Sequence, residues 1–321
     1  MPRLGGLAVI AGFAVSVIYL LITMSIEHKI DLFGEEQYYL KLLGFLIGIF
    51  ILGIFCFFDD LKNISPFLKL FGQILAALVV VKSGILIDRI SIPYFNTFIP
   101  EEIAGVIITV IWIVGITNAI NLIDGLDGLS SGISLISCVS LLMIFALNGS
   151  PVISIVLITA LAGAILGFLP YNFNPARTFL GDTGSNFLGY SLSIISILGM
   201  AKTYTAIVIV APLLVFALPI LDTGFAIIRR IFKTKSLKGV FKADKEHLHH
   251  KIMKRGYTQK QAVLILYGLS ATFGMFAIIL LDSGLWKALS FALMIIAIAA
   301  IGYKDILRIG DNDEDKTTKT K

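Results

Sequence analysis

Long apolar runs alternate with short polar segments along the whole chain, and each run is long enough to cross a membrane. An α-helix rises about 1.5 Å per residue, so about 20 residues cross a hydrocarbon core about 30 Å thick. Strands of a membrane barrel would instead show short segments of alternating polarity. The pattern therefore predicts an all-α polytopic integral membrane protein with about ten transmembrane helices, at 5–24, 38–57, 66–82, 103–118, 129–147, 152–169, 186–200, 204–221, 261–281 and 285–303.

Composition supports a membrane protein. The 321 residues are 57% hydrophobic and 15% charged, and the mean hydropathy is +0.92. Soluble domains carry about 25% charged residues. Both cysteines, Cys56 and Cys138, fall inside apolar runs without a CxxC partner, so we expect small buried side chains and no disulfide framework.

The distribution of positive charge predicts an orientation. Most of the 26 Lys and Arg residues fall in alternate loops on one side, chiefly in 229–260 and in the tail after Tyr303. By the positive-inside rule this side is cytoplasmic and holds both termini. We therefore expect a membrane-embedded unit at 1–303 with a cytoplasmic, His-containing loop at about 223–260. A polar tail at 304–321 is expected to be disordered and cytoplasmic. Nothing in this charge distribution calls for nucleic acid as a partner.

Five polar clusters interrupt the apolar runs, and the ten-span prediction places all five on the cytoplasmic side. They are FFDDLKN, which ends at Asn63; Lys69 with Gln73; NAINLIDGLDG from Asn118; NFNPARTFLGDTGSN from Asn172; and ADKEHLHH from Ala243. Their common side indicates a site at one membrane face.

Each cluster taken alone has a simpler explanation. Asp59 and Asp60 could end or cap a span, and Asp-Gly pairs such as Asp124-Gly125 are common in turns. The GDTGS stretch could cap the next helix, and the three histidines could lie on an exposed basic helix face. Taken together, the clusters weaken these explanations, because they bring seven carboxylates to one membrane face: Asp59, Asp60, Asp124, Asp127, Asp182, Asp222 and Asp244.

Carboxylates beside lysines and histidines predict a metal and phosphate site. Mg²⁺ prefers carboxylate, amide oxygen and phosphate ligands, and glycine-rich turns that enter a helix present backbone N–H groups to anions. A substrate that combines a nucleotide diphosphate with a lipid would need such a site. The chain contains neither GxxxxGK[ST] nor GxGxxG, so a Walker-type ATPase is not supported.

At these clusters the chain closely resembles the polyprenyl-phosphate N-acetylhexosamine-1-phosphate transferases. The stretches that match, in the family's order, are PRLGGLA, FFDDLKN, NAINLIDGLDGL, FNPARTFLGDTGSNFLG and HLHH. The resemblance implies a multi-pass enzyme of the bacterial inner (cytoplasmic) membrane with its active site on the cytoplasmic face. It implies Mg²⁺ as cofactor, with Mn²⁺ as the alternative ion. The implied substrates are a UDP-amino-sugar and a polyprenyl phosphate.

Within the family, ADKEHLHH is similar to the branch that transfers N-acetylglucosamine-1-phosphate from UDP-GlcNAc to undecaprenyl phosphate and releases UMP. That reaction begins cell-envelope polysaccharide or teichoic acid synthesis. The alternative is the phospho-MurNAc-pentapeptide transferase of peptidoglycan synthesis. That branch usually has three adjacent histidines, whereas Leu248 separates His247 from His249 here. Family members usually carry a further span before PRLGG, whereas this sequence starts at Met1-Pro2-Arg3. Either the true start lies earlier, or the protein has one helix fewer.

By motif position, the resemblance implies a site of eleven residues. Asp182 would be the principal Mg²⁺ ligand, and Asn121 would contribute its amide oxygen. Asp127 fits the position that contacts uracil, and Asp124 would support the same loop. The other members would be Asp59, Asp60, Lys62, Lys69, His247, His249 and His250.

The remaining roles concern the lipid phosphate and the sugar. Asp59, with Asp60 beside it, would face the lipid phosphate, while Lys69 and Lys62 would offset phosphate charge. The three histidines would close over the sugar diphosphate. Asp59 could accept a proton from the attacking phosphate or attack as a nucleophile. Direct attack is preferred, because a lipid phosphate is mostly ionised near pH 7.

Two further expectations concern the rival class and the oligomer. A membrane transporter would place its essential charges near mid-span, but here the carboxylates collect at one face. Gly163 and Gly167 form a GxxxG pattern that permits close helix packing, within the chain or in a homodimer. Surrounding membrane lipid is the other expected partner.

Overall fold

The computed structural model describes residues 5–26, 36–62, 64–87, 102–200, 210–234 and 247–296. Over these ranges every regular element is a helix, so the all-α prediction is confirmed for the part of the chain described. The elements are α1 (Gly5–Ile26), α2 (Glu36–Lys62), α3 (Pro66–Lys82), α4 (Glu102–Leu122), α5 (Leu129–Asn148), α6 (Val152–Asn172), α7 (Gly181–Met200), α8 (Val210–Val215), α9 (Ala217–Thr234), α10 (Leu248–Lys254) and α11 (Gln259–Ser283). A further apolar helix covers Leu285–Ile296.

Six of the described helices are long and apolar enough to cross a membrane: α1, α2, α4, α5, α6 and α11. The polytopic prediction thus holds at this coarser level. The tail at 304–321, Asp244 and most of the segment between α9 and α10 lie outside the described residues.

The span predicted at 204–221 is not one helix over its described part. Helix α8 ends at Val215, and α9 begins at Ala217 and continues to Thr234. Pro219 explains the break, because it has no N–H to donate to the carbonyl of Val215. Helix α9 therefore occupies the first part of the predicted loop at 223–260.

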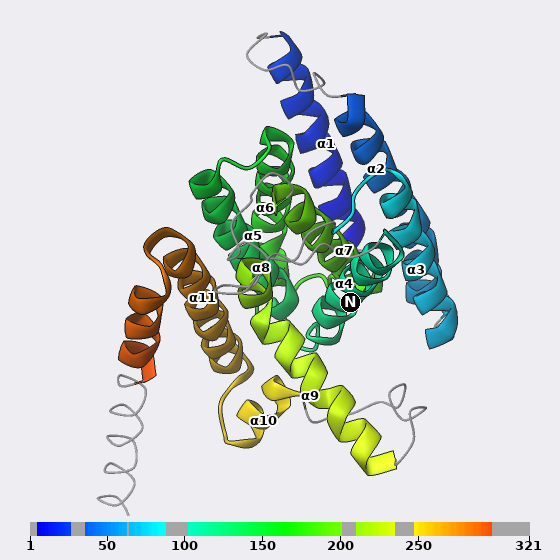
Figure 1. Cartoon of the computed structure of the whole chain (residues 1–321). Coiled ribbons are helices and arrows are strands. Elements are labelled where there is room, and N and C mark those ends of the chain that lie inside the picture. Colours follow the sequence, from blue (N-terminus) through cyan, green and yellow to red (C-terminus); the bar gives the residue numbers. More distant parts are fainter. Residues whose placement is uncertain are drawn as a thin grey trace, which may run out of the picture.

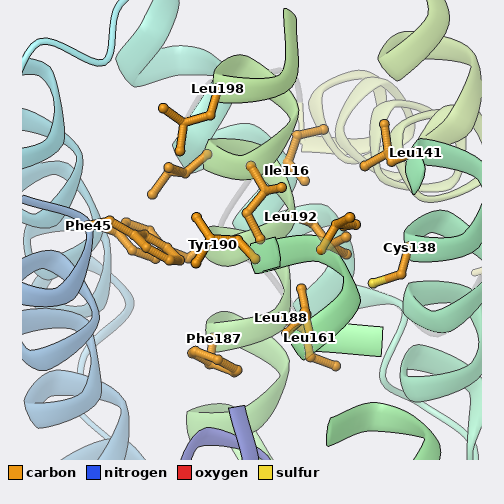
Figure 2. Close-up of a cluster of buried hydrophobic side chains, with 14 of the residues drawn as sticks. Phe45, Ile116, Cys138, Leu141, Leu161, Phe187, Leu188, Tyr190, Leu192 and Leu198 are labelled. Atoms are coloured by element: carbon orange, nitrogen blue, oxygen red, sulfur yellow. The ribbon is translucent and has the colours of Figure 1, made fainter. Parts of the chain in front are cut away.

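Helix α7 lies at the centre of the bundle and packs against α1, α2, α4, α5 and α6. Residues 183 to 199 of this helix are all buried. Figure 2 shows its side chains meeting those of its neighbours, among them Phe45 of α2, Ile116 of α4 and Leu161 of α6. Phe45 stacks on Tyr190 with ring centroids 6.1 Å apart. This rigid packing fixes the end of α7 that carries Asp182.

Small residues let the helices approach closely, as is common in membrane bundles. A Cβ on Gly189 of α7 would lie 2.7 Å from the Cα of Thr117 in α4, so only glycine fits this crossing. Gly163 and Gly167, in contrast, are exposed on α6 and have nothing within 4 Å of an added Cβ. The GxxxG pattern therefore makes no tight packing contact with the described part of the chain, and the homodimer stays a prediction.

One end of the bundle gathers the polar segments. The start of α1, the turn between α2 and α3, and helices α9 and α10 all lie at this end (Figure 1). The first turns of α3 and α7 and the last turn of α4 carry polar groups that meet there. The fold thus brings together clusters that are more than 100 residues apart in sequence.

Candidate active site

The amino end of α7 is capped by a carboxylate from another helix. Backbone N–H groups in the first turn of a helix have no partner within that helix. Here Asp182 N donates to Asp60 Oδ1 over 2.8 Å, and Thr183 N donates to Asp60 Oδ2 over 2.9 Å. The Thr183 hydroxyl donates to the same Oδ2 over 2.6 Å. Asp60, in the last turn of α2, therefore anchors the backbone that carries Asp182.

Lys69 bridges two carboxylates at the centre of this end. Its Nζ lies 3.0 Å from Asp59 Oδ2 and also donates to Asp182 Oδ1. Ser65 caps α3 by accepting from Leu68 N, which places Lys69 in the first turns of the helix. The other oxygen of Asp59 accepts from Ile64 N over 2.9 Å and holds the turn between α2 and α3.

Asn121 completes the polar centre from the last turn of α4. Its Nδ2 donates to Asp182 Oδ1 over 3.1 Å, and its Oδ1 accepts from the Ser185 hydroxyl over 3.2 Å. A half-turn of the amide would present Oδ1 beside the carboxylate of Asp182. The two oxygens then fit a hard divalent cation, and the ammonium of Lys69 already shows that this carboxylate accepts a positive charge.

Over the described ranges, no group of three or more His, Cys, Asp or Glu side chains is arranged to hold a metal ion. A Mg²⁺ ion usually takes one or two protein carboxylates and fills its other positions with water and substrate phosphate.

The loop between α4 and α5 forms one wall of the site, and Asp127 ties it to the loop before α7. Asp127 Oδ2 accepts from Asn174 Nδ2 over 3.0 Å and from Ala176 N over 3.1 Å. Gly128 adopts a left-handed conformation with φ of 78° and accepts a hydrogen bond from the Tyr267 hydroxyl. Asp127, for which the resemblance implies contact with uracil, thus braces this wall through its own carboxylate.

The amino end of α1 holds the opposite wall. Gly5 N donates to Phe179 O over 3.1 Å, and Gly6 N donates to Leu180 O over 2.9 Å. Any side chain on Gly6 would collide with the backbone of Gly184 in α7. The two glycines of PRLGGLA therefore serve to seat the turn that precedes Asp182.

These walls enclose a polar pocket of about 300 Å³. Its polar lining includes Asp60, Asn121, Asp124, Asp127, Asp182 and Ser185, and Phe179 contributes an aromatic side chain. Such a pocket is large enough for part of a nucleotide sugar. Five of the eleven sequence-predicted residues line it directly, and Lys69 reaches it through Asp182.

The three histidines lie at the start of α10, next to the loop between α4 and α5. His247 Nδ1 lies 2.9 Å from Asp222 Oδ2, and Asp222 Oδ1 accepts from Leu248 N over 2.8 Å. His249 stacks on His247 with ring centroids 5.8 Å apart, and the ring of His250 lies 4.2 Å from that of His249. The histidine segment is thereby anchored to α9 through Asp222.

His249 meets the pocket wall at Gly125. A Cβ on Gly125 would lie 2.5 Å from His249 Nε2. Both ring nitrogens of His249 are buried and have no hydrogen-bond partner. Burial and the neighbouring His250 lower the pKa of His249 to about 4, so the ring is neutral near pH 7. A neutral ring with two unused nitrogens beside the pocket is suited to bind a polar ligand.

The structure brings several of the residues singled out in the sequence together at one pocket, but the sequence did not indicate several of their contacts. Sequence reasoning treated Asp60 as a partner of Asp59 near the lipid phosphate, whereas in the structure the Asp60 carboxylate, from α2, caps the amino end of α7. It counted Asp222 among the carboxylates without seeing its pairing with His247. Ser185 was not singled out, although its place one turn after Asp182 was a usable signal. Lys62 is exposed at the end of α2 and does not line the pocket.

Asp124 gives a testable dependence of stability on pH. Burial, with the charges of Asp182 and Asp60, raises the pKa of Asp124 to about 8 from 3.8. Between these values the unfolded chain loses this proton and the folded protein keeps it, so rising pH lowers stability. In protein free of metal and nucleotide, Asp124→Asn should raise the melting temperature at pH 8 by about 2 °C or more. The gain should shrink towards pH 5, and a gain independent of pH would contradict this assignment.

Comparisons with known proteins show the family of the chain. Residues 42–200 match the model of glycosyl transferase family 4, a range that contains α7 and the pocket. A probable undecaprenyl-phosphate N-acetylglucosaminyl 1-phosphate transferase of Bacillus subtilis is 38% identical over 289 residues, which cover 90% of this chain and 76% of the relative.

Two further relatives are informative. A decaprenyl-phosphate N-acetylglucosaminephosphotransferase of Mycobacterium tuberculosis is 32% identical over 83% of this chain and 69% of its own length. A phospho-N-acetylmuramoyl-pentapeptide-transferase of Halalkalibacterium halodurans is 36% identical, but over only 38% of this chain and 34% of its own length. The long alignments and the family match together show that the chain belongs to glycosyl transferase family 4.

Proposed function

We propose that this protein transfers N-acetylglucosamine-1-phosphate from UDP-GlcNAc to undecaprenyl phosphate. The observation that carries the proposal is the meeting of Asp182, Lys69 and Asn121 at the rim of a polar pocket. That arrangement suits a diphosphate. The relatives that align over most of the chain are named for transfer of N-acetylglucosamine phosphate to polyprenyl phosphates.

The reaction balances without a redox step. An oxygen of the lipid phosphate attacks the β-phosphorus of UDP-GlcNAc, and the bond between this phosphorus and the bridging oxygen breaks. The bridging oxygen and its electron pair leave with UMP, and the product is undecaprenyl-diphospho-GlcNAc. Transfer of this kind depends mainly on positioning and on neutralising charge. The product would serve cell-envelope polysaccharide or teichoic acid synthesis.

Asp182 and Asn121 are proposed to hold Mg²⁺, with Mn²⁺ as the alternative ion. The support is the convergence of a carboxylate and an amide in one polar centre. When bound, the ion would supply positive charge that stabilises the diphosphate and the leaving UMP. Lys69 contributes a second positive charge from α3 and neutralises the lipid phosphate or the diphosphate beside it.

Asp59 is proposed to orient Lys69 towards the phosphates during direct attack. Both of its carboxylate oxygens already accept contacts, one from Ile64 N and one from Lys69. A carboxylate held in this way is better suited to positioning than to nucleophilic attack. Asp127 is proposed to contact uracil from the pocket wall, Asp124 to support the same loop, and the histidines to close over the sugar diphosphate.

The proposed setting is a bacterial cytoplasmic membrane with the pocket on the cytoplasmic face. Six of the described helices are long and apolar enough to cross a membrane, which supports a multi-pass protein. The distribution of positive charge along the sequence supports the orientation. A total of ten spans and a homodimer remain part of the proposal. The lipid phosphate would then meet the pocket at the membrane surface while UDP-GlcNAc enters from the cytoplasm.

Gly125→Ala should lower kcat by about 10-fold to 100-fold. The new methyl group would collide with His249 and push the histidine segment from the pocket wall, and a shift near 1 Å can cost about 100-fold in rate. Steady-state kinetics on purified protein would measure the effect, with Gly256→Asn as a control, because residue 256 has a left-handed φ of 92° and open space around it. Wild-type kcat in Gly125→Ala would contradict the role given to this contact.

The proposal is tested by offering purified protein two nucleotide sugars with undecaprenyl phosphate. UDP-GlcNAc should give a lipid-linked sugar and UMP, whereas UDP-MurNAc-pentapeptide should give neither. Product from the pentapeptide substrate alone would assign the chain to the other reaction. Absence of product from both would overturn the proposed function.

A further inference from the structure

Three amide side chains form a hydrogen-bonded triad beneath the candidate active site. Gln73 Nε2 donates to Asn186 Oδ1 over 2.8 Å and to Asn118 Oδ1 over 3.3 Å, and Gln73 Oε1 accepts from Asn118 Nδ2 over 2.6 Å. The exposed fraction is 1% for Gln73 and 0% for Asn186. This amide triad connects α3, α4 and α7.

The two asparagines are already oriented by their own helices. Asn118 Nδ2 also donates to Val114 O, and Asn186 Nδ2 donates to Asp182 O, both over 2.8 Å. Each asparagine therefore uses its NH₂ group on its own backbone and turns its oxygen towards Gln73. As a result, the single NH₂ group of Gln73 serves both neighbours and is the hub of the triad.

Each member of the triad lies one helical turn from a residue of the site on the same helix. Gln73 is four residues after Lys69, Asn118 is three before Asn121, and Asn186 is four after Asp182. Residues three or four apart lie on the same face of a helix.

The hydrogen bonds of the triad therefore depend directly on the relative positions of α3, α4 and α7, the three helices that carry the site. One residue of slip along a helix is about 1.5 Å, which is enough to break these bonds.

The surrounding core alone would not set this register. Apolar side chains in a bundle tolerate sliding and repacking, whereas a buried polar group that has only one set of partners selects one arrangement. The triad is a buried polar link between α3, α4 and α7, one helical turn from the contacts that Lys69 and Asn121 make with Asp182. Asp60 fixes the end of α7 against α2, but it does not reach α3 or α4.

We propose that Gln73 is a positioning residue for the transfer reaction. Through the amide triad it sets the spacing of Lys69, Asn121 and Asp182, and thereby the geometry of the charges around the diphosphate. This inference rests on the proposed function, since the spacing matters for a reaction that passes through those three groups. Uracil binding does not depend on Gln73, because the Asp127 loop is held by Asn174, Ala176 and Tyr267.

Replacement of Gln73 by Met tests the proposal, since Met has a similar length and shape but no hydrogen-bonding amide. We expect kcat to fall about 10-fold to 100-fold, with KM for UDP-GlcNAc and the affinity for UMP within about threefold of wild type. UMP binding is measured directly by titration without lipid substrate. The matched control is Asn148→Leu, which removes an amide that donates to Ile144 O. Asn148 is the last residue of α5, at the end opposite to the loop that lines the pocket.

A rescue experiment separates positioning from general damage. Gln73→Asn and Asn186→Gln should each lower kcat, because each changes the length of one of the two bonded side chains by a methylene group. The double variant Gln73→Asn/Asn186→Gln restores the summed length of the arm between residues 73 and 186, although not that of the arm to Asn118. It should therefore be more active than the weaker single variant, by about tenfold. Thermal unfolding of each protein shows whether it is folded.

Three results would overturn the inference while leaving the proposed function intact. They are wild-type kcat in Gln73→Met, a loss of kcat matched by an equal loss of UMP affinity, and a double variant no better than its parents. If wild-type protein forms no lipid-linked sugar, the proposed function fails first, and the inference fails with it.

Discussion

Asp182→Asn is expected to lower kcat about 1,000-fold or more. Asp182 supplies a carboxylate that meets both Lys69 and Asn121. The neutral amide of Asn would offset neither the charge of Lys69 nor that of the proposed Mg²⁺. A loss of this size corresponds to about 4 kcal/mol of transition-state stabilisation. The fold should be retained, because the backbone of residue 182 makes these bonds: its N–H donates to Asp60, and its carbonyl accepts from Asn186.

Steady-state kinetics over a range of Mg²⁺ concentrations would measure this effect. The concentration of Mg²⁺ that gives half-maximal activity should rise in the variant, while the melting temperature stays close to wild type. Asp282→Asn is the matched control, because Asp282 is exposed at the far end of α11. A kcat near wild type in Asp182→Asn would remove the metal and charge assignment.

The adjacent carboxylates Asp59 and Asp60 should give different results when each is replaced by Asn. The Asp60 carboxylate accepts from two backbone N–H groups and a hydroxyl. In Asp60→Asn, one of its two oxygens is replaced by an NH₂ group, and the remaining oxygen is a weaker, uncharged acceptor. Loss of hydrogen bonds to a charged group should lower the free energy of unfolding by about 3 kcal/mol. Activity should fall as well, because α7 carries Asp182.

Asp59→Asn, in contrast, should mainly affect catalysis. The Asn oxygen can still accept from Ile64 N, so we expect a loss of about 1 kcal/mol or less in stability. Lys69 loses one of its two carboxylates, and kcat should fall about 100-fold. Chemical unfolding and kinetics of both variants test the pair together. Equal losses of stability in the two variants would contradict the separate functions.

The helices that the sequence predicted best are those with clear ends. The expected span at 129–147 corresponds to α5, which follows Gly128 and ends before Gly149, and the span at 66–82 has the bounds of α3, between Ser65 and Ser83. Hydropathy misjudged α7, which begins at Gly181 rather than at 186. Its first turn is polar in sequence, and Asp60, the carboxylate that caps this turn, is 122 residues away in the sequence.

The residues of the site were predictable by type, but their partners were not. Neighbouring residues in a helix point in directions about 100° apart, so Asp59 and Asp60 cannot both face the same ligand. Which of the two faces α3 and which faces α7 depends on helix packing. The pairing of His247 with Asp222 and the contact of His249 with Gly125 likewise depend on where α9 and α10 lie.

The partners of Gln73 could not be predicted from the sequence either. The sequence placed it beside Lys69 in a polar cluster, one turn further along α3. Its two amide partners come from α4 and α7, and nothing in their spacing along the chain indicates the contact. Buried amides in apolar runs are the usable signal, because an unpaired amide in a membrane bundle is costly and therefore implies a partner.

The most direct test of the central claim is the fate of the β-phosphate of the nucleotide sugar. Purified protein would be given undecaprenyl phosphate and UDP-GlcNAc labelled with ³²P in the β-phosphate and with ¹⁴C in the sugar. Transfer of the sugar with its phosphate predicts a lipid product that carries both labels in equal amounts, and UMP without ³²P. A lipid product with ¹⁴C but no ³²P, or release of labelled UDP, would contradict the account.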